Sequence, residues 1–258
     1  MVVLKNDTPS LQESSLMPLN RANVKKVTAI GKLANSQQIV DWGSLWVRDS
    51  HIVSPLSAFY QDTSFITLYN DGSSIRTAVE AAKEADVTIV IVGYAGRDEG
   101  EYFICIDEEG NKKVLSGRWT LNEHDIALAK AVVSMNSKSV LILVGSSAII
   151  LDKELREKFT SILYGWYWGC EGGNALQDVL WGNAESWGRL PFVIPASGKD
   201  LRRWDPDARE VTYDRWWGYR LLNCQKNTPV YRFGFGLGYG QHEFTDFGNG
   251  SRIEWRKV

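Results

Sequence analysis

The sequence predicts an α/β fold, a mostly parallel, doubly wound sheet flanked by helices, formed as a single domain over residues 1–258. Runs of β-branched and other apolar residues alternate along the chain with segments of helical periodicity, as when crossover helices join parallel strands. Hydrophobic residues make up 44% of the chain, enough for a large core at this length. No internal repeat and no Pro- or Ser-rich linker divides it.

Five apolar runs are predicted to be the strands, and several of them are apolar on both faces, as a sheet covered by helices requires. They are VKKVTAI, SFITLYN, DVTIVIVG, SVLILVG and TSILYGW, at 24–30, 64–70, 86–93, 139–145 and 160–166. Helices are predicted between and after them, over 73–85, 121–135 and 170–182. Asn122 is suited to cap the second of these helices.

Three long segments interrupt this alternation and are predicted to be irregular loops: 31–62, 94–120 and 196–234. The second of them directly follows DVTIVIVG and is rich in Asp and Glu. Ligands of open α/β sheets bind at the carboxyl ends of the strands, and long loops are often functional. We therefore expect the functional residues of this chain to lie in the acidic loop.

Composition excludes several classes of function. Basic and acidic residues nearly balance, with a net charge of −2, so we expect no nucleic-acid partner. No run is long enough for a membrane helix and no secretory signal is visible, so we expect no membrane partner and a cytoplasmic location if the chain is expressed as given. Its cysteines and histidines are isolated, so we expect neither a metal nor a cofactor.

The string GYAGRDEGEY (93–102) is the first candidate segment for catalytic residues. A glutamate on such a loop becomes a general acid when a neighbouring carboxylate or a dry environment raises its pKa, and glycosidases need such an acid. A solvated acidic loop is the alternative. The glycines do not form the dinucleotide-binding pattern Gly-x-Gly-x-x-Gly.

Aromatic residues near the predicted loops are the second candidate, because flat rings stack on the apolar faces of sugars. They include Trp42, Tyr102, Tyr167, Trp168 and the pair Trp216-Trp217. Packing in the core is the alternative, and it is the interpretation we prefer for Trp166 and Trp181. The pair Gly172-Gly173 suggests a tight strand-to-helix junction. Its backbone amides could face an anion or a hydroxyl group, or its glycines could allow the helix to pack closely on the sheet.

Several strings together resemble the C-terminal α/β sandwich domain of glycoside hydrolase family 3, the family of β-glucosidases and related exo-glycosidases. WYWGCEGGNALQDVLWGNAESWGRLPFVIP (166–195) is similar to the longest signature of that domain. MVVLKND and VTAIGKLAN resemble its opening, and VTYDRWWGYRLL and YRFGFGLGYGQHEF resemble its closing motifs. The resemblance runs in order along essentially the whole chain.

The resemblance implies an active site between two domains. In the family, a (β/α)8 barrel supplies the nucleophile and this domain supplies the acid/base glutamate. Either Glu101 or Glu99 can be aligned with that glutamate by moving one gap, and Glu101 is slightly preferred. Tyr102 resembles the aromatic residue that stacks on the leaving-group sugar. The other substrate-binding candidates are Asp98, Arg118, Trp42 and Ser44.

The chain departs from the family pattern at three places. Gly117 stands where the family usually has Asp, Leu45 follows Gly43-Ser44 where a second Ser is usual, and Trp187 replaces the Ser of Ser-Gly-Arg. Above all, the resemblance to this domain takes up essentially the whole of the given chain, so we expect the barrel to come from elsewhere. Retaining hydrolysis of a β-glycoside, which needs two carboxyl groups, is therefore expected only with a barrel partner.

Three alternatives stay open. The chain could be a β-glucosidase-type half that needs a barrel in trans, with self-association over the surface that the barrel would cover. It could be a catalytically inactive carbohydrate-binding or interaction module. It could also hydrolyse sugars alone, with Asp41 as the second carboxylate.

Overall fold

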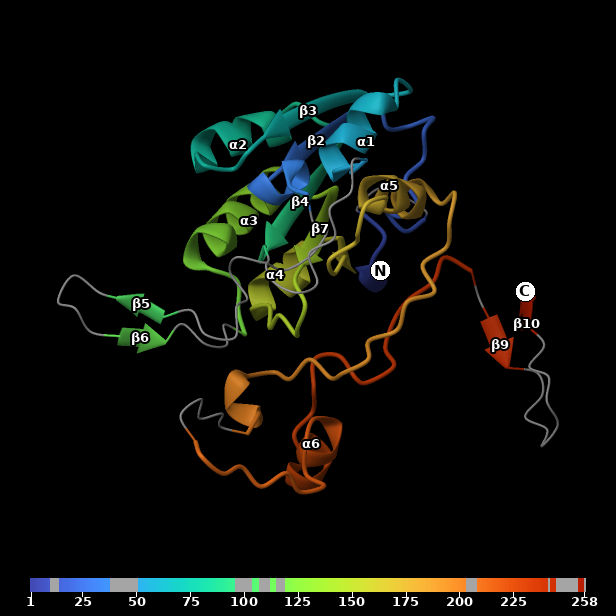
Figure 1. Cartoon of the computed structure of the whole chain (residues 1–258). Helices are drawn as coiled ribbons and strands as arrows, with labels where there is room; N and C mark the ends of the chain where they lie inside the picture. The colour runs from blue at the N-terminus through green and yellow to red at the C-terminus, as the bar shows by residue number, and fades with distance from the viewer. Residues whose placement is uncertain are drawn as a thin grey trace.

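The computed structural model of the protein contains a six-stranded sheet between two layers of helices (Figure 1). It describes residues 1–9, 14–37, 51–95, 104–106, 112–114, 119–202, 208–240, 242–244 and 255–257. In spatial order the strands are β1 (Val2–Asn6), β8 (Ser161–Tyr164), β7 (Ser139–Val144), β4 (Val87–Gly93), β2 (Lys26–Ile30) and β3 (Ile66–Asn70). Two further pairs are β5 (Ile104–Ile106) with β6 (Lys112–Val114) and β9 (His242–Phe244) with β10 (Trp255–Lys257).

All neighbours in the main sheet are parallel except β1, which pairs antiparallel with β8. The central strand β4 is buried at every position, and Ile89 lies opposite Ala29 of β2 and Val140 of β7. A strand without a solvent-facing side needs apolar residues throughout, which is why DVTIVIVG carries almost no polar side chain. The predicted mostly parallel, doubly wound sheet is confirmed.

Two hydrophobic clusters, one on each face of the sheet, hold the layers together. Alternate side chains of β4 point to opposite faces, Val90 and Val92 into one cluster and Ile89 and Ile91 into the other. The first cluster includes α2 (Ile75–Lys83), α3 (Glu123–Met135) and α4 (Lys153–Lys158); the second includes α1 (Pro55–Gln61) and α5 (Gly172–Trp181). Figure 1 shows α2, α3 and α4 on one side and α1 and α5 on the other.

Polar side chains fix where the helices begin. The side chains of Ser54, Ser74, Asn122 and Asp152 each accept a hydrogen bond from a backbone N–H in the first turn of α1, α2, α3 and α4. The prediction that Asn122 caps its helix is therefore confirmed. Gly182, with a φ of 73°, ends α5 in the left-handed conformation that favours glycine.

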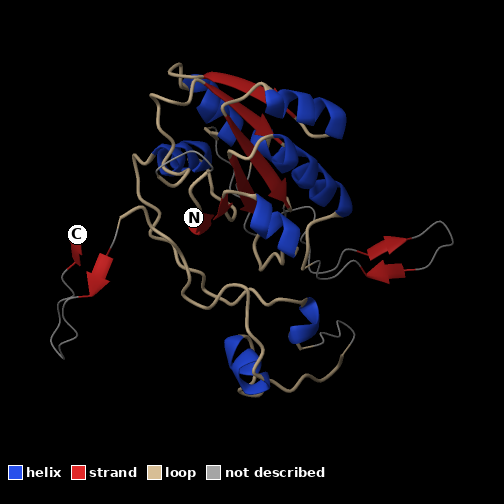
Figure 2. Cartoon of the chain, turned by 180° about the vertical axis from the view of Figure 1, so that it is seen from behind, coloured by secondary structure: helices blue, strands red, loops and turns tan. Residues whose placement is uncertain are grey.

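The long loops contain more structure than the sequence analysis predicted. Segment 31–62 holds the short helix η1 (Lys32–Asn35) and α1, so it is not wholly irregular. The segment after β4 contains the strands of the β5–β6 hairpin, and segment 196–234 contains η3 (Gly198–Asp200) and α6 (Tyr219–Gln225). Figures 1 and 2 both show β5, β6 and α6 away from the main sheet. Among the described residues, the helices are all too short or too polar to cross a membrane.

Candidate functional site

The strand order creates a point where the chain changes direction between two neighbouring strands. From β2 the chain crosses to β3 on one side, whereas from β4 it crosses to β7 on the other. The segments that leave the carboxyl ends of β2 and β4 therefore diverge, and open α/β sheets bind their ligands at such a switch point. The two segments are the first and second of the long loops identified from the sequence.

Glycines end both strands at this switch point. Gly31 follows β2 with a φ of 112°, and a Cβ there would lie 2.2 Å from the carbonyl oxygen of Ile91 in β4. Gly93 ends β4 with a φ of 137°, and a Cβ there would lie 2.0 Å from the carbonyl oxygen of Val144 in β7. Any side chain would collide with neighbouring backbone, so only glycine lets each strand turn away so close to the next.

The two ends of the loop after β4 are fixed to each other. Tyr94 is 5% exposed, and its backbone N donates to Val144 O at 2.9 Å. Its hydroxyl donates to the carbonyl oxygen of Thr120, where the chain returns to begin α3. Because Tyr94 and Thr120 are hydrogen-bonded to each other, the loop between them begins and ends at the carboxyl end of β4.

The start of α3 reinforces this base. Asn122 accepts a hydrogen bond from the backbone N of Asp125 at 2.8 Å and donates its amide to the carboxylate of Asp125 at 3.0 Å. The same carboxylate oxygen accepts a hydrogen bond from Gly93 N at 3.4 Å. In addition, His124 Nε2 lies 2.8 Å from the carbonyl oxygen of Gly72, just after β3. The capping residues of α3 thus join the ends of β3 and β4.

The first long loop returns to the same edge of the sheet. The backbone N of Val53 donates to Cys170 O at 2.8 Å, and Gly173 N donates to Val53 O at 2.9 Å. A Cβ on Gly173 would lie 2.2 Å from the carbonyl oxygen of Ser54. Of the two roles considered for Gly172-Gly173, Gly173 therefore has the packing role, and its N–H is used within the protein.

The predicted catalytic and substrate-binding residues lie outside the described residues. Trp42 and Ser44 belong to the first loop, between η1 and α1. The others belong to the loop after β4: Asp98, Glu99, Glu101, Tyr102 and Arg118. Their roles stay predictions, but the described residues on either side attach both loops to the carboxyl edge of the sheet.

Sequence reasoning missed the residues that hold the loop after β4. Tyr94 stood out only as part of an acidic string, and Asp125 did not stand out at all. The available signals were an aromatic residue directly after the most apolar strand and the pattern Asn-x-x-Asp at the start of a helix. Tyr94 anchors both ends of the loop, and Asp125 connects the helix cap to Gly93.

The aromatic candidates fall into two groups. Trp181 is 8% exposed and packs on Phe65 with ring centroids 4.9 Å apart, so its predicted core position is confirmed. Trp166 is partly buried against the first hydrophobic cluster, which also agrees with a core position. By contrast, Trp217 stacks on Tyr213 at 4.6 Å and lies under the guanidinium of Arg202, outside both hydrophobic clusters.

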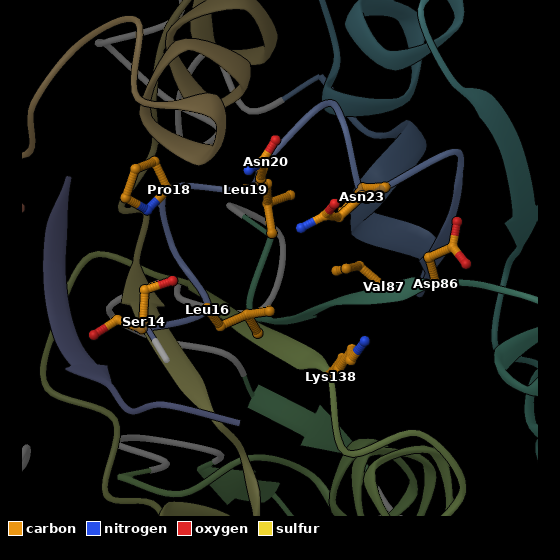
Figure 3. Close-up of a pocket in the computed structure, with 11 residues that line it drawn as sticks. Ser14, Leu16, Pro18, Leu19, Asn20, Asn23, Asp86, Val87 and Lys138 are labelled. Carbon is orange, nitrogen blue, oxygen red and sulfur yellow. The ribbon is translucent and has the colours of Figure 1, made fainter. Parts of the chain in front are cut away.

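A cavity of ≈ 340 Å³ lies at the opposite, amino edge of the sheet (Figure 3). Val24, Asp86 and Lys138, which line it, each precede a parallel strand. Figure 3 shows Leu16 and Leu19 on one side of the space and Lys138 on another. Asp86 is already engaged, because its Oδ2 accepts hydrogen bonds from the backbone N of Lys25 and of Lys26. This cavity is therefore not part of the switch-point site.

A second cavity, of ≈ 450 Å³, lies at the carboxyl end of β8, between residues 165–168, α5 and residues 184–188. Tyr239 lies beside it and donates its hydroxyl to Val179 O at 2.6 Å. Burial, with the nearby Glu185 carboxylate, raises the pKa of Tyr239 well above its usual value, so this tyrosine stays a neutral donor. Within the described part of the chain, no group of three or more His, Cys, Asp or Glu residues is arranged to hold a metal ion.

Comparison with known proteins identifies relatives of the chain. The model of the glycosyl hydrolase family 3 C-terminal domain matches residues 1–239. The chain is 27% identical over 215 residues to a probable beta-glucosidase L of Aspergillus terreus, covering 80% of this chain and 28% of that protein. It is 26% identical over 274 residues to beta-glucosidase BoGH3A of Bacteroides ovatus, covering 95% of this chain and 35% of the relative.

The fold matches solved structures as well. A beta-D-glucoside glucohydrolase from Trichoderma reesei superposes with a TM-score of 0.74 at 23% identity, covering 95% of this chain and 36% of that one. The α/β sandwich of this chain thus matches the fold of about a third of that neighbour's chain. The chain spans about a third of the length of the relatives that it matches.

Proposed function

The chain belongs to the glycosyl hydrolase family 3 C-terminal domain family, and on that premise we propose that it is the acid/base half of a β-glucosidase-type hydrolase. In this proposal residues 1–258 form one domain, and Glu101 or Glu99 protonates the leaving-group oxygen of a β-glycoside. The observation that carries the proposal is the attachment of the loop after β4 to the switch point through Tyr94, Thr120 and Asp125.

The partner in this proposal is a (β/α)8 barrel that supplies the attacking carboxylate. Retaining hydrolysis needs two carboxyl groups about 5–5.5 Å apart on either side of the glycosidic bond. The relatives named above are about three times as long as this chain, which supports a second domain or subunit as the source of the nucleophile. We propose a carbohydrate with a β-linked glucose at its end as the substrate, because the relatives are beta-glucosidases by name.

The remaining predicted residues take supporting roles. Tyr102 stacks on the sugar that leaves, and Trp42, Ser44, Asp98 and Arg118 contact the substrate from the two loops. The hydrogen bonds of Tyr94 at the two ends of the loop help to position the candidate glutamates. Such positioning matters because a general acid must lie within hydrogen-bond reach of the oxygen that it protonates. Firm attachment at both ends restricts where the glutamates of the loop can be placed.

Mixing the chain with the barrel part of a family relative, or joining the two in one chain, tests the proposal with a chromogenic β-glucoside. We expect hydrolysis only when both parts are present. Glu101→Gln or Glu99→Gln lowers it by about 10²–10⁴-fold, whereas the control Glu109→Gln, in the same acidic loop, does not. Activity of the purified chain alone that is lost in Asp41→Asn, or no activity in either arrangement, contradicts the proposal.

A further inference from the structure

The ≈ 450 Å³ cavity at the carboxyl end of β8 has no role in the proposed function. Its volume lies within the range of small-molecule sites. Its described lining residues come from the β8–α5 connection, from α5, from segment 184–188 and from Met1, and none belongs to the loop after β4. A ligand here would therefore contact a different set of residues from those of the proposed active site.

Aromatic side chains form much of the wall. Trp166, Tyr167, Trp168 and Trp187 all line the cavity. The ring of Trp168 lies against two glycines, because a Cβ on Gly165 or Gly172 would come within 2.5 Å or 2.4 Å of it. Trp187, in contrast, is 51% exposed. The cavity thus combines a ring fixed by close packing with one open to solvent.

One residue that lines this cavity has a strained backbone conformation. Trp166 has a φ of 65°, a left-handed conformation that side chains other than glycine rarely adopt. Its ring is held by Tyr164 at 4.6 Å and Phe192 at 5.3 Å between centroids. Strained backbone of this kind persists only where the surroundings enforce it, and such positions cluster at ligand sites.

Two carboxylates, those of Asp178 and Glu185, are part of the wall. Glu185 is fixed because its Oε1 accepts hydrogen bonds from the backbone N of Tyr239 at 2.9 Å and of Gly240 at 2.8 Å. Asp178 accepts one from the Asn183 amide at 3.1 Å. No lysine, arginine or histidine is among the described residues that line the cavity. Two carboxylates without a basic side chain disfavour a phosphate or any other anion.

We propose that this cavity is a binding site for a neutral pyranose sugar, separate from the proposed active site. The C–H face of a pyranose packs on an aromatic ring, while its hydroxyl groups donate to carboxylate oxygens such as those of Asp178 and Glu185. Binding here involves no bond breaking and requires no barrel. Its failure would therefore leave the proposed function standing, and the reverse also holds.

Titration of the full chain with methyl β-D-glucopyranoside and with cellobiose, followed by tryptophan fluorescence and calorimetry, tests this site. We expect a dissociation constant on the order of 1 mM. Trp187→Ala and Asp178→Asn each weaken binding at least about tenfold, by removing a ring or a charged acceptor. The matched controls are Tyr60→Ala, an exposed aromatic residue on α1, and Glu80→Gln, an exposed carboxylate on α2, and both bind as the unaltered chain does.

Glu101→Gln and Glu99→Gln distinguish this site from the proposed active site, and we expect unchanged sugar binding in both. Circular dichroism of every variant confirms that it is folded. Three results overturn the inference: no binding of either sugar at about 100 times the expected dissociation constant, binding that Glu101→Gln or Glu99→Gln abolishes while Trp187→Ala does not, or tetramethylammonium binding more tightly than both sugars.

Discussion

At the scale of single residues, the chemistry of the proposed active site depends on groups that carry no catalytic function themselves. Gly93 lets β4 end against β7, and Tyr94 then joins the two ends of the loop that holds the candidate glutamates. Neither residue needs to touch a substrate. Their effect is to fix the root of the loop, so their loss should appear in stability before it appears in chemistry.

Gly93→Ala should be one of the most destabilising single changes at this edge. Its new Cβ would overlap the carbonyl oxygen of Val144, in addition to the backbone penalty of a positive φ. Gly169→Ala is the matched control, because Gly169 has a φ of 72° but a Cβ there would meet no atom within 4 Å. We expect about 1–2 kcal/mol for the control and at least about 1–3 kcal/mol more for Gly93→Ala. Urea unfolding measures both, and equal losses would contradict the overlap.

Tyr94→Phe tests whether the Tyr94 hydroxyl joins the two ends of the loop after β4. It removes the hydroxyl that donates to Thr120 O and leaves that carbonyl without this bond. We expect a loss of about 0.5–1.5 kcal/mol in the free energy of unfolding. Tyr60→Phe, at an exposed tyrosine on α1, should change it by less than about 0.5 kcal/mol. If the two variants unfold at the same urea concentration, the Tyr94 hydroxyl does not close the loop.

At the scale of elements, α3 and α4 are tied on their outer side by a charge cluster. Lys130 of α3 contacts Asp152 and Glu154 at 2.7 Å each, and Lys158 contacts Glu154 at 2.8 Å. Hydrogen bonds from these two lysines lower the pKa of Glu154 from its ordinary value to about 2. A depressed folded-state pKa contributes stability above the ordinary carboxyl pKa, and this contribution is lost as the pH falls toward about 2.

Lys130→Met should therefore raise the pKa of Glu154 toward its ordinary value and make stability less sensitive to acid. Lys153→Met is the control, because Lys153 pairs with Glu157 and not with Glu154. A carbon-detected NMR titration of the side-chain carboxyl follows Glu154 directly. An ordinary pKa for Glu154 in the unaltered chain would show that the cluster does not form in solution.

The elements also show how far the sequence predicts this molecule. Long apolar or amphipathic segments were predicted within a few residues, such as 86–93 for β4 and 121–135 for α3. Short elements were missed because too few residues repeat a pattern: α4 is KELREK with one buried residue, and α1 has only seven residues. Their positions follow from caps and from contacts with distant segments, which local periodicity does not record.

The sequence was sufficient to predict at which edge of the sheet the acidic loop attaches, but not which hydrogen bonds hold it there. The acidic loop after DVTIVIVG was expected at the carboxyl edge of the sheet, and β4 does end beside the switch point. The bonds from Tyr94 to Thr120 and from Asp125 to Gly93 join residues far apart in the sequence, so no local pattern indicated them. The same applies to the second cavity, in which Glu185 and Trp187 meet the β8–α5 connection.

At the scale of the whole molecule, segment 208–240 presents apolar side chains that the sandwich does not cover. The large exposed hydrophobic side chains of this segment are Val211, Tyr213, Tyr219, Phe233 and Leu237. Exposed apolar surface of this kind favours association with another protein surface. In the proposed function the natural partner is the barrel, and without it a second copy of the chain can cover the same side chains.

We therefore expect the isolated chain to associate as its concentration rises. Tyr213→Ser combined with Phe233→Ser should lower this association, because Tyr213 is 67% and Phe233 57% exposed. The control is Tyr60→Ser on α1, because Tyr60 is 57% exposed, as Phe233 is. Sedimentation velocity over a range of concentrations gives the answer. A monomer at every concentration would show that this surface needs no partner.

The central claim is that the loop after β4 supplies a proton donor to a sugar whose attacking carboxylate comes from another domain or subunit. The most direct test uses the chain combined with the barrel part of a family relative. It measures how the rate of hydrolysis depends on the leaving group, from nitrophenyl to phenyl to alkyl β-glucosides. The account predicts that Glu101→Gln or Glu99→Gln slows cleavage more steeply as the leaving group becomes more basic, because only poor leaving groups need protonation. Rates that show the same leaving-group dependence in both variants as in the unaltered enzyme would contradict it.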